Sequence, residues 1–147
     1  MAVEHTEHNK DVEHTEHNKD IVRRAIAAMS RGDMDGFLAD AADDVTFTPI
    51  GTVPRFSGRI QGKDVLLKGL KRALSARLEE GRIEMTIENL IAEGEYIAEQ
   101  AHGKARTKTG KDYNNTYCRV WRIADGKVQS VVEYLDTELL RSGLAEG

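Results

Sequence analysis

Apolar side chains recur at helical spacing in two stretches of the first half of the chain. The first stretch, from Ile21 to Met29, predicts a helix over about residues 15–30, which Gly32 would end. Asp33 is suited to cap a second, short helix that reaches about residue 42. The second stretch predicts a third helix over about residues 63–80, whose apolar stripe is formed by Val65, Leu66, Leu70, Ala73, Leu74 and Leu78.

From Arg82 onward polar and apolar residues alternate, which is the pattern of half-buried strands. An earlier strand is expected at VTFTPI, residues 45–50, followed by a loop. The chain is therefore predicted to be an α+β domain, with three N-terminal helices packed on a curved antiparallel sheet and a pocket at the mouth of that sheet. The four alternating strands are expected at about residues 82–91, 95–107, 112–123 and 127–136.

The N-terminus contains a duplication, because VEHTEHNKD occupies residues 3–11 and again residues 12–20. The four histidines of the two copies suggest a metal site. On a helix, however, nine residues turn the chain by about 900°, or two and a half turns, so the two copies would face opposite sides. We therefore predict no metal site, and we interpret residues 1–17 as a duplicated, frayed leader before a single domain over residues 18–147. The histidines are His5, His8, His14 and His17.

The composition narrows the class of protein further. The chain has 147 residues, of which 39% are hydrophobic and 31% charged, as in one soluble globular domain. No apolar run approaches the roughly 20 residues that cross a bilayer, and the lone Cys118 fits a reducing compartment, so we expect a cytoplasmic protein without a membrane partner. A net charge of -4 argues against a nucleic-acid partner. No cofactor-binding motif occurs, so no cofactor is predicted.

Two segments carry a resemblance to a known superfamily. They are RGDMDGFLADAADDVTFTPIG at residues 31–51 and TGKDYNNTYCRVWRIADGKVQSVVEYLDT at residues 109–137. Both are similar to the nuclear transport factor 2-like superfamily, which includes ketosteroid isomerases, limonene epoxide hydrolases and SnoaL-like polyketide cyclases. The resemblance covers about residues 18–144. It implies a cone-shaped α+β barrel, and a homodimer that pairs through the open face of the sheet.

The catalytic residues of these families match the chain to different degrees. The resemblance places Ala25, Thr48 and Arg119 where a ketosteroid isomerase carries its tyrosine and two acids, and none of the three can replace them. The Asp–Arg–Asp set of the limonene epoxide hydrolases falls on His102, Gln100 and Glu133, so only one carboxylate is kept. The SnoaL-like cyclases match better, because their His-Gly pair falls on His102-Gly103 and their acid–base carboxylate on Glu133.

The hairpin at residues 124–126 decides which side chains share the pocket. A two-residue turn would pair Cys118 with Glu133, whereas a three-residue loop with a glycine bulge would pair Tyr117 with Glu133. A slip of one residue moves every side chain to the other face of the sheet. We choose the three-residue loop, because the resemblance places both Arg119 and Glu133 in the pocket.

This register predicts a polar cluster with a coherent chemistry. Glu133 would act as general base, with His102 and Arg119 assisting, and Arg119 or Tyr117 would stabilise an enolate-like oxygen. His102 is assigned inward together with Gln100, since both lie on one face of their strand. The residues expected to bind the substrate are Gln100, Asn115, Tyr117, Phe47 and Trp121.

The favoured function is therefore a cyclase, isomerase or dehydratase that moves protons on a hydrophobic carbonyl compound. Glu133 and Arg119 also have a plain interpretation as a buried salt bridge. Two alternative functions stay open, a non-catalytic module for ligand binding or assembly and a divergent limonene epoxide hydrolase-like hydrolase. The expected partners are a small hydrophobic molecule and a second copy of the chain.

Overall fold

The computed structural model describes residues 2–146, and the side chains from Val12 onward. Its helices are α1 (Ala2–Ser30), α2 (Met34–Phe37), α3 (Lys63–Arg77) and α4 (Thr137–Leu140), with a 3-10 turn at Glu79–Gly81 and a π-helix at Arg141–Ala145. Its strands are β1 (Ala41–Pro49), β2 (Ile60–Gln61), β3 (Glu84–Glu93), β4 (Tyr96–Lys104), β5 (Thr116–Ala124) and β6 (Lys127–Leu135).

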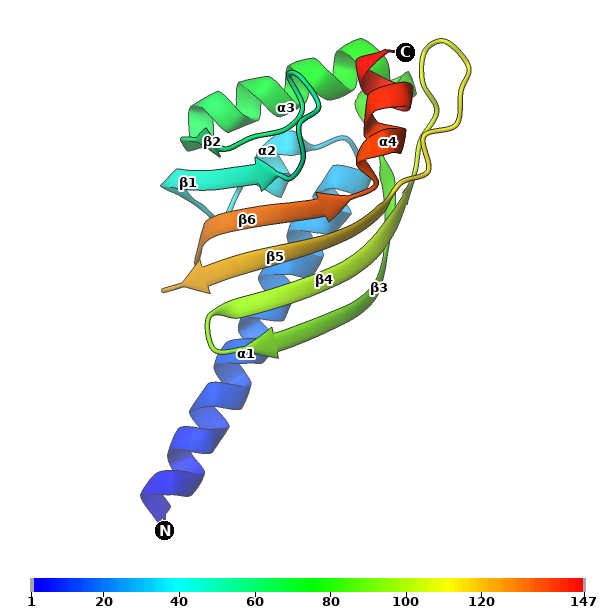
Figure 1. Ribbon diagram of the computed structural model, residues 1–147. Coiled ribbons are helices and arrows are strands. Elements are labelled where there is room, and N and C mark those ends of the chain that lie inside the picture. Colours follow the sequence, from blue (N-terminus) through cyan, green and yellow to red (C-terminus); the bar gives the residue numbers. More distant parts are fainter. Residues whose placement is uncertain (1, 147) are drawn as a thin grey trace.

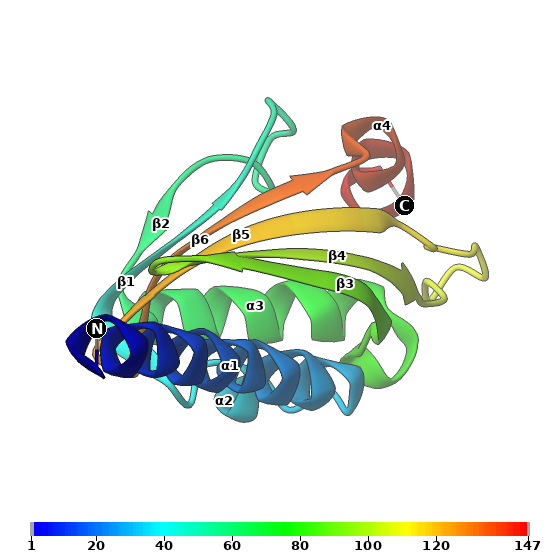
Figure 2. The ribbon, with the colours of Figure 1, turned by 90° about the horizontal axis from the view of Figure 1, so that it is seen from below.

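The strands form one curved sheet in the order β2-β1-β6-β5-β4-β3 (Figure 1). All neighbours pair antiparallel except β1 and β6, which run parallel. Helices α1, α2 and α3 cover one face of the sheet (Figure 2). The predicted α+β class is confirmed, with three additions that the sequence pattern did not indicate: strand β2, helix α4 and the π-helix.

Helix α1 packs on the sheet through the apolar stripe that the sequence predicted. Ile21, Val22, Ala25, Ile26 and Met29 are all buried in the core. The helix begins at Ala2, well before the expected start near residue 15, and extends past the edge of the sheet (Figure 1). The interpretation of residues 1–17 as a leader stays a prediction.

In the described part of the chain, the histidines of the duplicated segment do not form a metal site. His14 and His17 are exposed, and the side chains of His5 and His8 lie outside the described residues. Between residues 12 and 146, no three His, Cys, Asp or Glu side chains come close enough together to hold a metal ion. In the same part of the chain, no helix is long and apolar enough to span a membrane.

The β5–β6 hairpin has a two-residue turn, so the expected three-residue loop is wrong, and beyond a bulge its pairing is one that neither predicted register contains. Asp125 and Gly126 have φ of 52° and 72°, so the turn has two residues, as Ala124 pairs with Lys127. A bulge near Gln129 then shifts the register, so that Glu133 faces Arg119. The expected pairing of Tyr117 with Glu133 is wrong. The shared face of Glu133 and Arg119 is confirmed, because the true register differs from the chosen one by two residues, which preserves the face.

Candidate functional site

A cavity of about 170 Å³ lies between α3, the concave face of the sheet and the C-terminal helical segment. Its walls are mostly apolar. Two strands contribute polar groups deep in it, Tyr117 and Arg119 from β5 and Glu133 from β6. The remaining lining residues are Met29, Phe47, Pro49, Arg55, Phe56, Ile60, Gly69, Leu70, Ala73, Leu74, Ile83, Tyr113, Leu135, Leu140 and Leu144.

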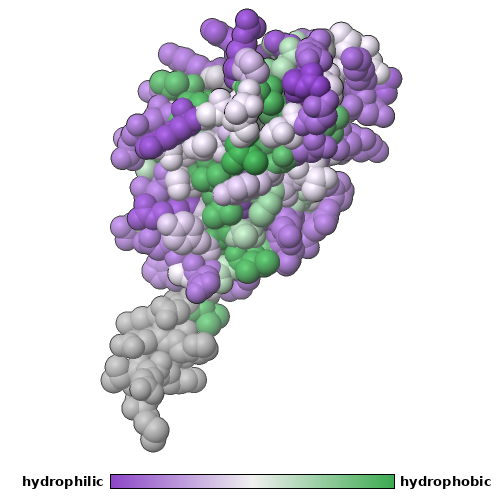
Figure 3. All heavy atoms as spheres, viewed as in Figure 1, coloured by the Kyte–Doolittle hydropathy of each residue, from purple (hydrophilic) through white to green (hydrophobic). Residues whose placement is uncertain are grey.

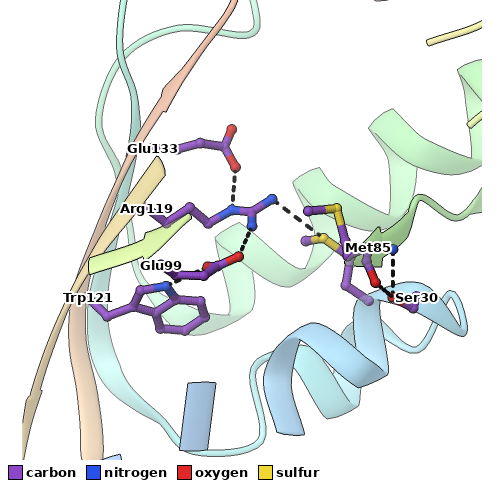
Figure 4. Close-up of polar contacts among 7 residues, drawn as sticks. Ser30, Met85, Glu99, Arg119, Trp121 and Glu133 are labelled. Carbon is purple, nitrogen blue, oxygen red and sulfur yellow. Dashed lines mark hydrogen bonds and ion pairs between the residues drawn. The ribbon is translucent and has the colours of Figure 1, made fainter. Parts of the chain in front are cut away.

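Arg119 links two carboxylates beneath this cavity (Figure 4). Its Nε donates to Glu133 Oε2 at 2.8 Å, and its Nη1 donates to Glu99 Oε2 at 2.7 Å. Trp121 Nε1 donates to the other oxygen of Glu99 at 2.9 Å. Arg119 and Glu99 are only 1% and 0% exposed, so the whole set lies in the core rather than on the surface. Of the two carboxylates, Glu133 lines the cavity and Glu99 does not.

Burial and neighbouring charges shift the pKa values of Glu99 and Arg119 in opposite directions. Burial raises the pKa of Glu99, and the nearby Arg119 and the Trp121 hydrogen bond partly offset that effect. Burial by itself would lower the pKa of Arg119, but Glu99 and Glu133 together raise it above its usual value. Arg119 is therefore a permanent cation.

Tyr117 lines the cavity beside Arg119. The Arg119 guanidinium stacks over its ring, with Cζ 4.4 Å from the ring centroid. The Tyr117 hydroxyl is buried and has no partner at hydrogen-bond distance in the described structure, although the Tyr113 hydroxyl is a near neighbour. Burial raises the pKa of Tyr117 well above its usual value, with Tyr113 and Glu133 adding to the effect. The hydroxyl therefore keeps its proton and remains a hydrogen-bond donor.

Tyr113 and Asn115 hold the floor of the cavity from the segment that precedes β5. Asn115 Nδ2 donates to the Tyr113 hydroxyl at 3.0 Å and to the carbonyl of Asp136 at 3.1 Å. The Asn115 side chain is buried and does not line the cavity. The structure therefore gives Asn115 a structural position behind Tyr113, rather than the direct ligand contact that the sequence suggested.

The two aromatic residues predicted to bind a ligand take different positions. Phe47 lines the cavity. Trp121 is 1% exposed, packs edge-on against Phe37 with ring centroids 5.9 Å apart, and donates to Glu99. It lies beneath the cavity and positions the carboxylate rather than the ligand.

The inward assignment of His102 and Gln100 is wrong. Both are exposed on the outer face of β4, where His102 Nδ1 lies 2.5 Å from Glu88 Oε1 and Gln100 accepts from Asn89. The opposite set, Ile97, Glu99 and Ala101, points inward. The physical reason is that Arg119 and Trp121 satisfy the Glu99 carboxylate, so the charged residue can be buried and the histidine stays in water.

Sequence reasoning thus missed Glu99, and a signal for it was present. Ile97, Ala101 and Gly103 share its face, and these apolar or small residues are typical of the buried side of a strand. Gly103 has a specific reason to be small, since a Cβ there would lie 2.6 Å from Ile83 Cγ2 and 3.2 Å from Tyr117 Cε2. Arg55, Tyr113 and the C-terminal Leu140 and Leu144 were also missed, because loops and chain ends reach the cavity only through the tertiary fold.

Comparison with protein families matches residues 22–131 to the SnoaL-like domain. No curated protein sequence matches the chain at a significant level. Several solved structures share the fold. A nuclear transport factor 2-like protein from Burkholderia xenovorans is 28% identical, with a TM-score of 0.70, covering 88% of this chain and 97% of its own.

Two further structures carry functional descriptions of their own. An LEH-like epoxide hydrolase from Mycobacterium tuberculosis is 21% identical, with a TM-score of 0.72, and the match covers 91% of this chain and 93% of that one. A protein from Jannaschia sp. CCS1, assigned as a SnoaL-like polyketide cyclase, is 14% identical, with a TM-score of 0.73 and coverage of 90% and 94%. At these identities the likeness shows the fold alone.

Proposed function

This chain belongs to the SnoaL-like domain family, and from that premise we propose that it is an enzyme that moves a proton beside the carbonyl group of a small apolar compound. Isomerisation, cyclisation and dehydration all begin with this step. The observation that carries the proposal is the meeting of Glu133 with Tyr117, whose buried hydroxyl has no hydrogen-bond partner among the described residues, in the lining of one apolar cavity.

Glu133 is the proposed general base. Its Oε2 is held by Arg119 Nε, whereas its Oε1 has no hydrogen-bond partner in the described structure and is free to accept a proton. Tyr117 would donate to the ligand oxygen as the carbon–hydrogen bond breaks and negative charge moves onto that oxygen. Glu133 then returns the proton to another carbon. In a cyclisation the enolate carbon instead attacks a second carbonyl, the π electrons of that C=O move onto its oxygen, and Glu133 returns the proton to this oxygen.

Arg119 is proposed as a positioning residue rather than as a direct partner of the ligand. Its Nε and Nη1 are engaged by the two carboxylates, and its Nη2 faces Met29 Sδ at 3.9 Å. His102 takes no part in this mechanism because it lies on the other face of the sheet.

The cavity volume bears on the size of the ligand. A cavity of about 150 Å³ lined by aliphatic and aromatic residues is known to hold benzene. A cavity of about 170 Å³ therefore suits a compound with one ring, with any further part of the molecule at the mouth.

Hydrogen–deuterium exchange tests the proposal without knowledge of the natural product. One-ring ketones are incubated with the protein in D₂O, and loss of the hydrogens next to the carbonyl is followed by NMR. We expect exchange in the wild type, and a fall of about 10²–10⁴-fold in Glu133→Gln with ligand binding kept. Glu88→Gln, on the outer face, is the matched control and should exchange like the wild type. Equal exchange in both variants would contradict the role of Glu133.

Epoxide hydrolysis is a second candidate, favoured by the carboxylate–arginine–carboxylate arrangement of Glu99, Arg119 and Glu133. In this reaction Glu133 would activate a water molecule that attacks an epoxide carbon. Glu99 is fully buried and does not line the cavity, so it cannot protonate the leaving oxygen, and Tyr117 would have to do so. Diol formation from a panel of one-ring epoxides would favour this candidate over proton transfer at carbon. Binding with neither exchange nor diol would leave a non-catalytic binding module.

We also propose a homodimer formed through the outer face of the sheet. Apolar side chains cross this face (Figure 3), and no helix of the described chain covers it. Val120 pairs with Val132 there, and Cys118 pairs with Tyr134, whose side chain is 46% exposed. An uncovered apolar sheet face is a typical surface for a partner of the same kind.

A further inference from the structure

Arg55 occupies a turn that is strained for its side chain. The N–H of Phe56 donates to the carbonyl of Val53 at 3.1 Å, Pro54 follows Val53, and Arg55 has φ of 70°. These features are those of a type II turn, whose third position requires positive φ and is normally glycine or asparagine. Arginine is disfavoured there because its Cβ crowds the backbone.

The surrounding loop holds this turn in place. Ser57 Oγ accepts from the N–H of Val53 and donates to the carbonyl of Ile50, each at 3.0 Å. The N–H of Gly58 donates to the carbonyl of Pro49 at 3.0 Å. Strain that is retained under such constraint occurs often at ligand sites.

Arg55 is an exposed residue in the lining of the cavity, and it has no ion pair with any described residue. Arg119, the other cation of the lining, is neutralised by Glu99 and Glu133. A second arginine contacts two residues of the lining, since Arg77 Cζ is 5.8 Å from the ring centroid of Phe56 and its Nη1 donates to the carbonyl of Leu144. Two arginines without an ion pair among the described residues therefore lie near the apolar cavity, although the chain as a whole has a net charge of -4.

We infer that Arg55 binds an anionic group of the ligand, and that the ligand is a one-ring carbonyl compound bearing a carboxylate. The inference rests on the proposed function, because it takes the ring and the carbonyl to lie against Tyr117 and Glu133. The carboxylate then lies at the mouth, where the planar guanidinium of Arg55 can donate two parallel hydrogen bonds to it.

Matched pairs of ligands test the inference. Oxocyclohexane carboxylates with the acid at different ring positions are compared with their primary amides, which have the same shape without the charge. By calorimetry the wild type should bind at least one acid about tenfold more tightly than its amide, since a hydrogen bond to a charged group is worth about that factor. High salt should weaken acid binding more than amide binding.

Two variants of the same loop separate a specific role from general charge. Arg55→Gln should weaken acid binding about tenfold and leave amide binding within about twofold. Arg59→Gln is the control, because Arg59 is exposed and unpaired among the described residues but does not line the cavity. It should bind both ligands like the wild type. The inference would be overturned if the acids bind no better than the amides, which includes the case in which neither binds. Equal losses of acid binding in the two variants would also overturn it.

Arg55→Gly adds a readout that a merely structural arginine would not produce. Glycine accepts the positive φ without strain, so this variant should melt at a higher temperature while it loses the preference for acids. A lower melting temperature would show that the arginine supports the loop and would overturn the inference. If the wild type shows no preference for acids but still shows Glu133-dependent hydrogen–deuterium exchange, only the proposed function is supported. If it prefers acids but shows no exchange, only the anion site is supported.

Discussion

Tyr117 and Tyr113 both line the cavity, but their hydroxyl groups differ in hydrogen bonding. The Tyr113 hydroxyl accepts a hydrogen bond from Asn115, whereas the Tyr117 hydroxyl has no partner in the described structure. A buried hydroxyl without a partner costs stability, and such groups in native proteins call for an explanation. The explanation that we propose is a ligand oxygen that the hydroxyl binds.

Tyr117→Phe should therefore separate function from stability. We expect an unchanged free energy of unfolding, or one up to about 1 kcal/mol higher, together with a fall of about 10–100-fold in exchange rate. Tyr113→Phe is the comparison and should lower the free energy of unfolding by about 1 kcal/mol, because Asn115 loses its acceptor. Urea unfolding and the exchange assay measure both quantities. A large loss of stability in Tyr117→Phe would contradict the assignment.

Glu99 gives a prediction on pH. In the unfolded chain this carboxyl loses its proton near the usual pKa of 4.5, whereas burial makes the folded protein hold the proton to higher pH. The folded state then binds more protons than the unfolded state, so stability falls as the pH rises from about 4.5 through the folded pKa.

Glu99→Gln removes this dependence. Relative to the variant, the wild type should lose about 1.4 kcal/mol for each pH unit by which the folded pKa exceeds the usual value, and the difference should be constant below the window. Urea unfolding of both proteins across a pH series checks it. Glu88→Gln, an exposed substitution, is the control. A wild type that gains stability over the variant as the pH rises would refute the burial argument.

At the scale of elements, the contact between β4 and β5 depends on a small residue. Gly103 faces Ile83, Met85 and Tyr117, and an added Cβ would meet their side chains at 2.6, 3.0 and 3.2 Å. The His102-Gly103 pair that resembles the SnoaL-like cyclases therefore has a packing role through its glycine. Its histidine faces the other side of the sheet.

Gly103→Ala should lower the free energy of unfolding by about 1–3 kcal/mol, the usual cost of overpacking a core, and should disturb the ring of Tyr117. Gly69→Ala is the matched substitution. Gly69 lies within α3 with no atom near the position of a new Cβ, so alanine there should raise stability by up to about 1 kcal/mol. Thermal unfolding of the two variants should thus shift in opposite directions, and a shared direction would contradict the packing argument.

At the scale of the whole molecule, the two faces of the sheet have separate tasks. The concave face carries the cavity, and the outer face is left uncovered by α1, α2 and α3 (Figure 2). We expect light scattering after size exclusion to give the mass of a dimer.

Tyr134→Lys should shift that dimer towards monomer, because a charge in the centre of an apolar interface must be desolvated. Val65→Lys is the control, because Val65 is 61% exposed on α3, which packs on the opposite face of the sheet. Equal masses for the wild type and Tyr134→Lys would place the interface elsewhere or exclude it.

The sequence by itself determined the order of the elements. The apolar stripe of α1, the strand alternation after Arg82 and the turn glycines lie where the pattern predicted them, because these features depend on local periodicity. The stripe of α3 is confirmed except at Val65, which is 61% exposed. The common face of Arg119 and Glu133 also followed from the sequence, with the help of the family resemblance.

Only the tertiary structure decided which face of β4 is buried and what completes the site. Glu99 is inward because a guanidinium and an indole N–H from β5 satisfy its carboxylate, and no local pattern along β4 encodes those partners. The bulge in β6, the unpaired hydroxyl of Tyr117 and the position of Arg55 at the cavity likewise depend on contacts between residues far apart in the chain. Periodicity specifies which residues share a face, whereas the balance of desolvation and pairing across strands decides which face is buried.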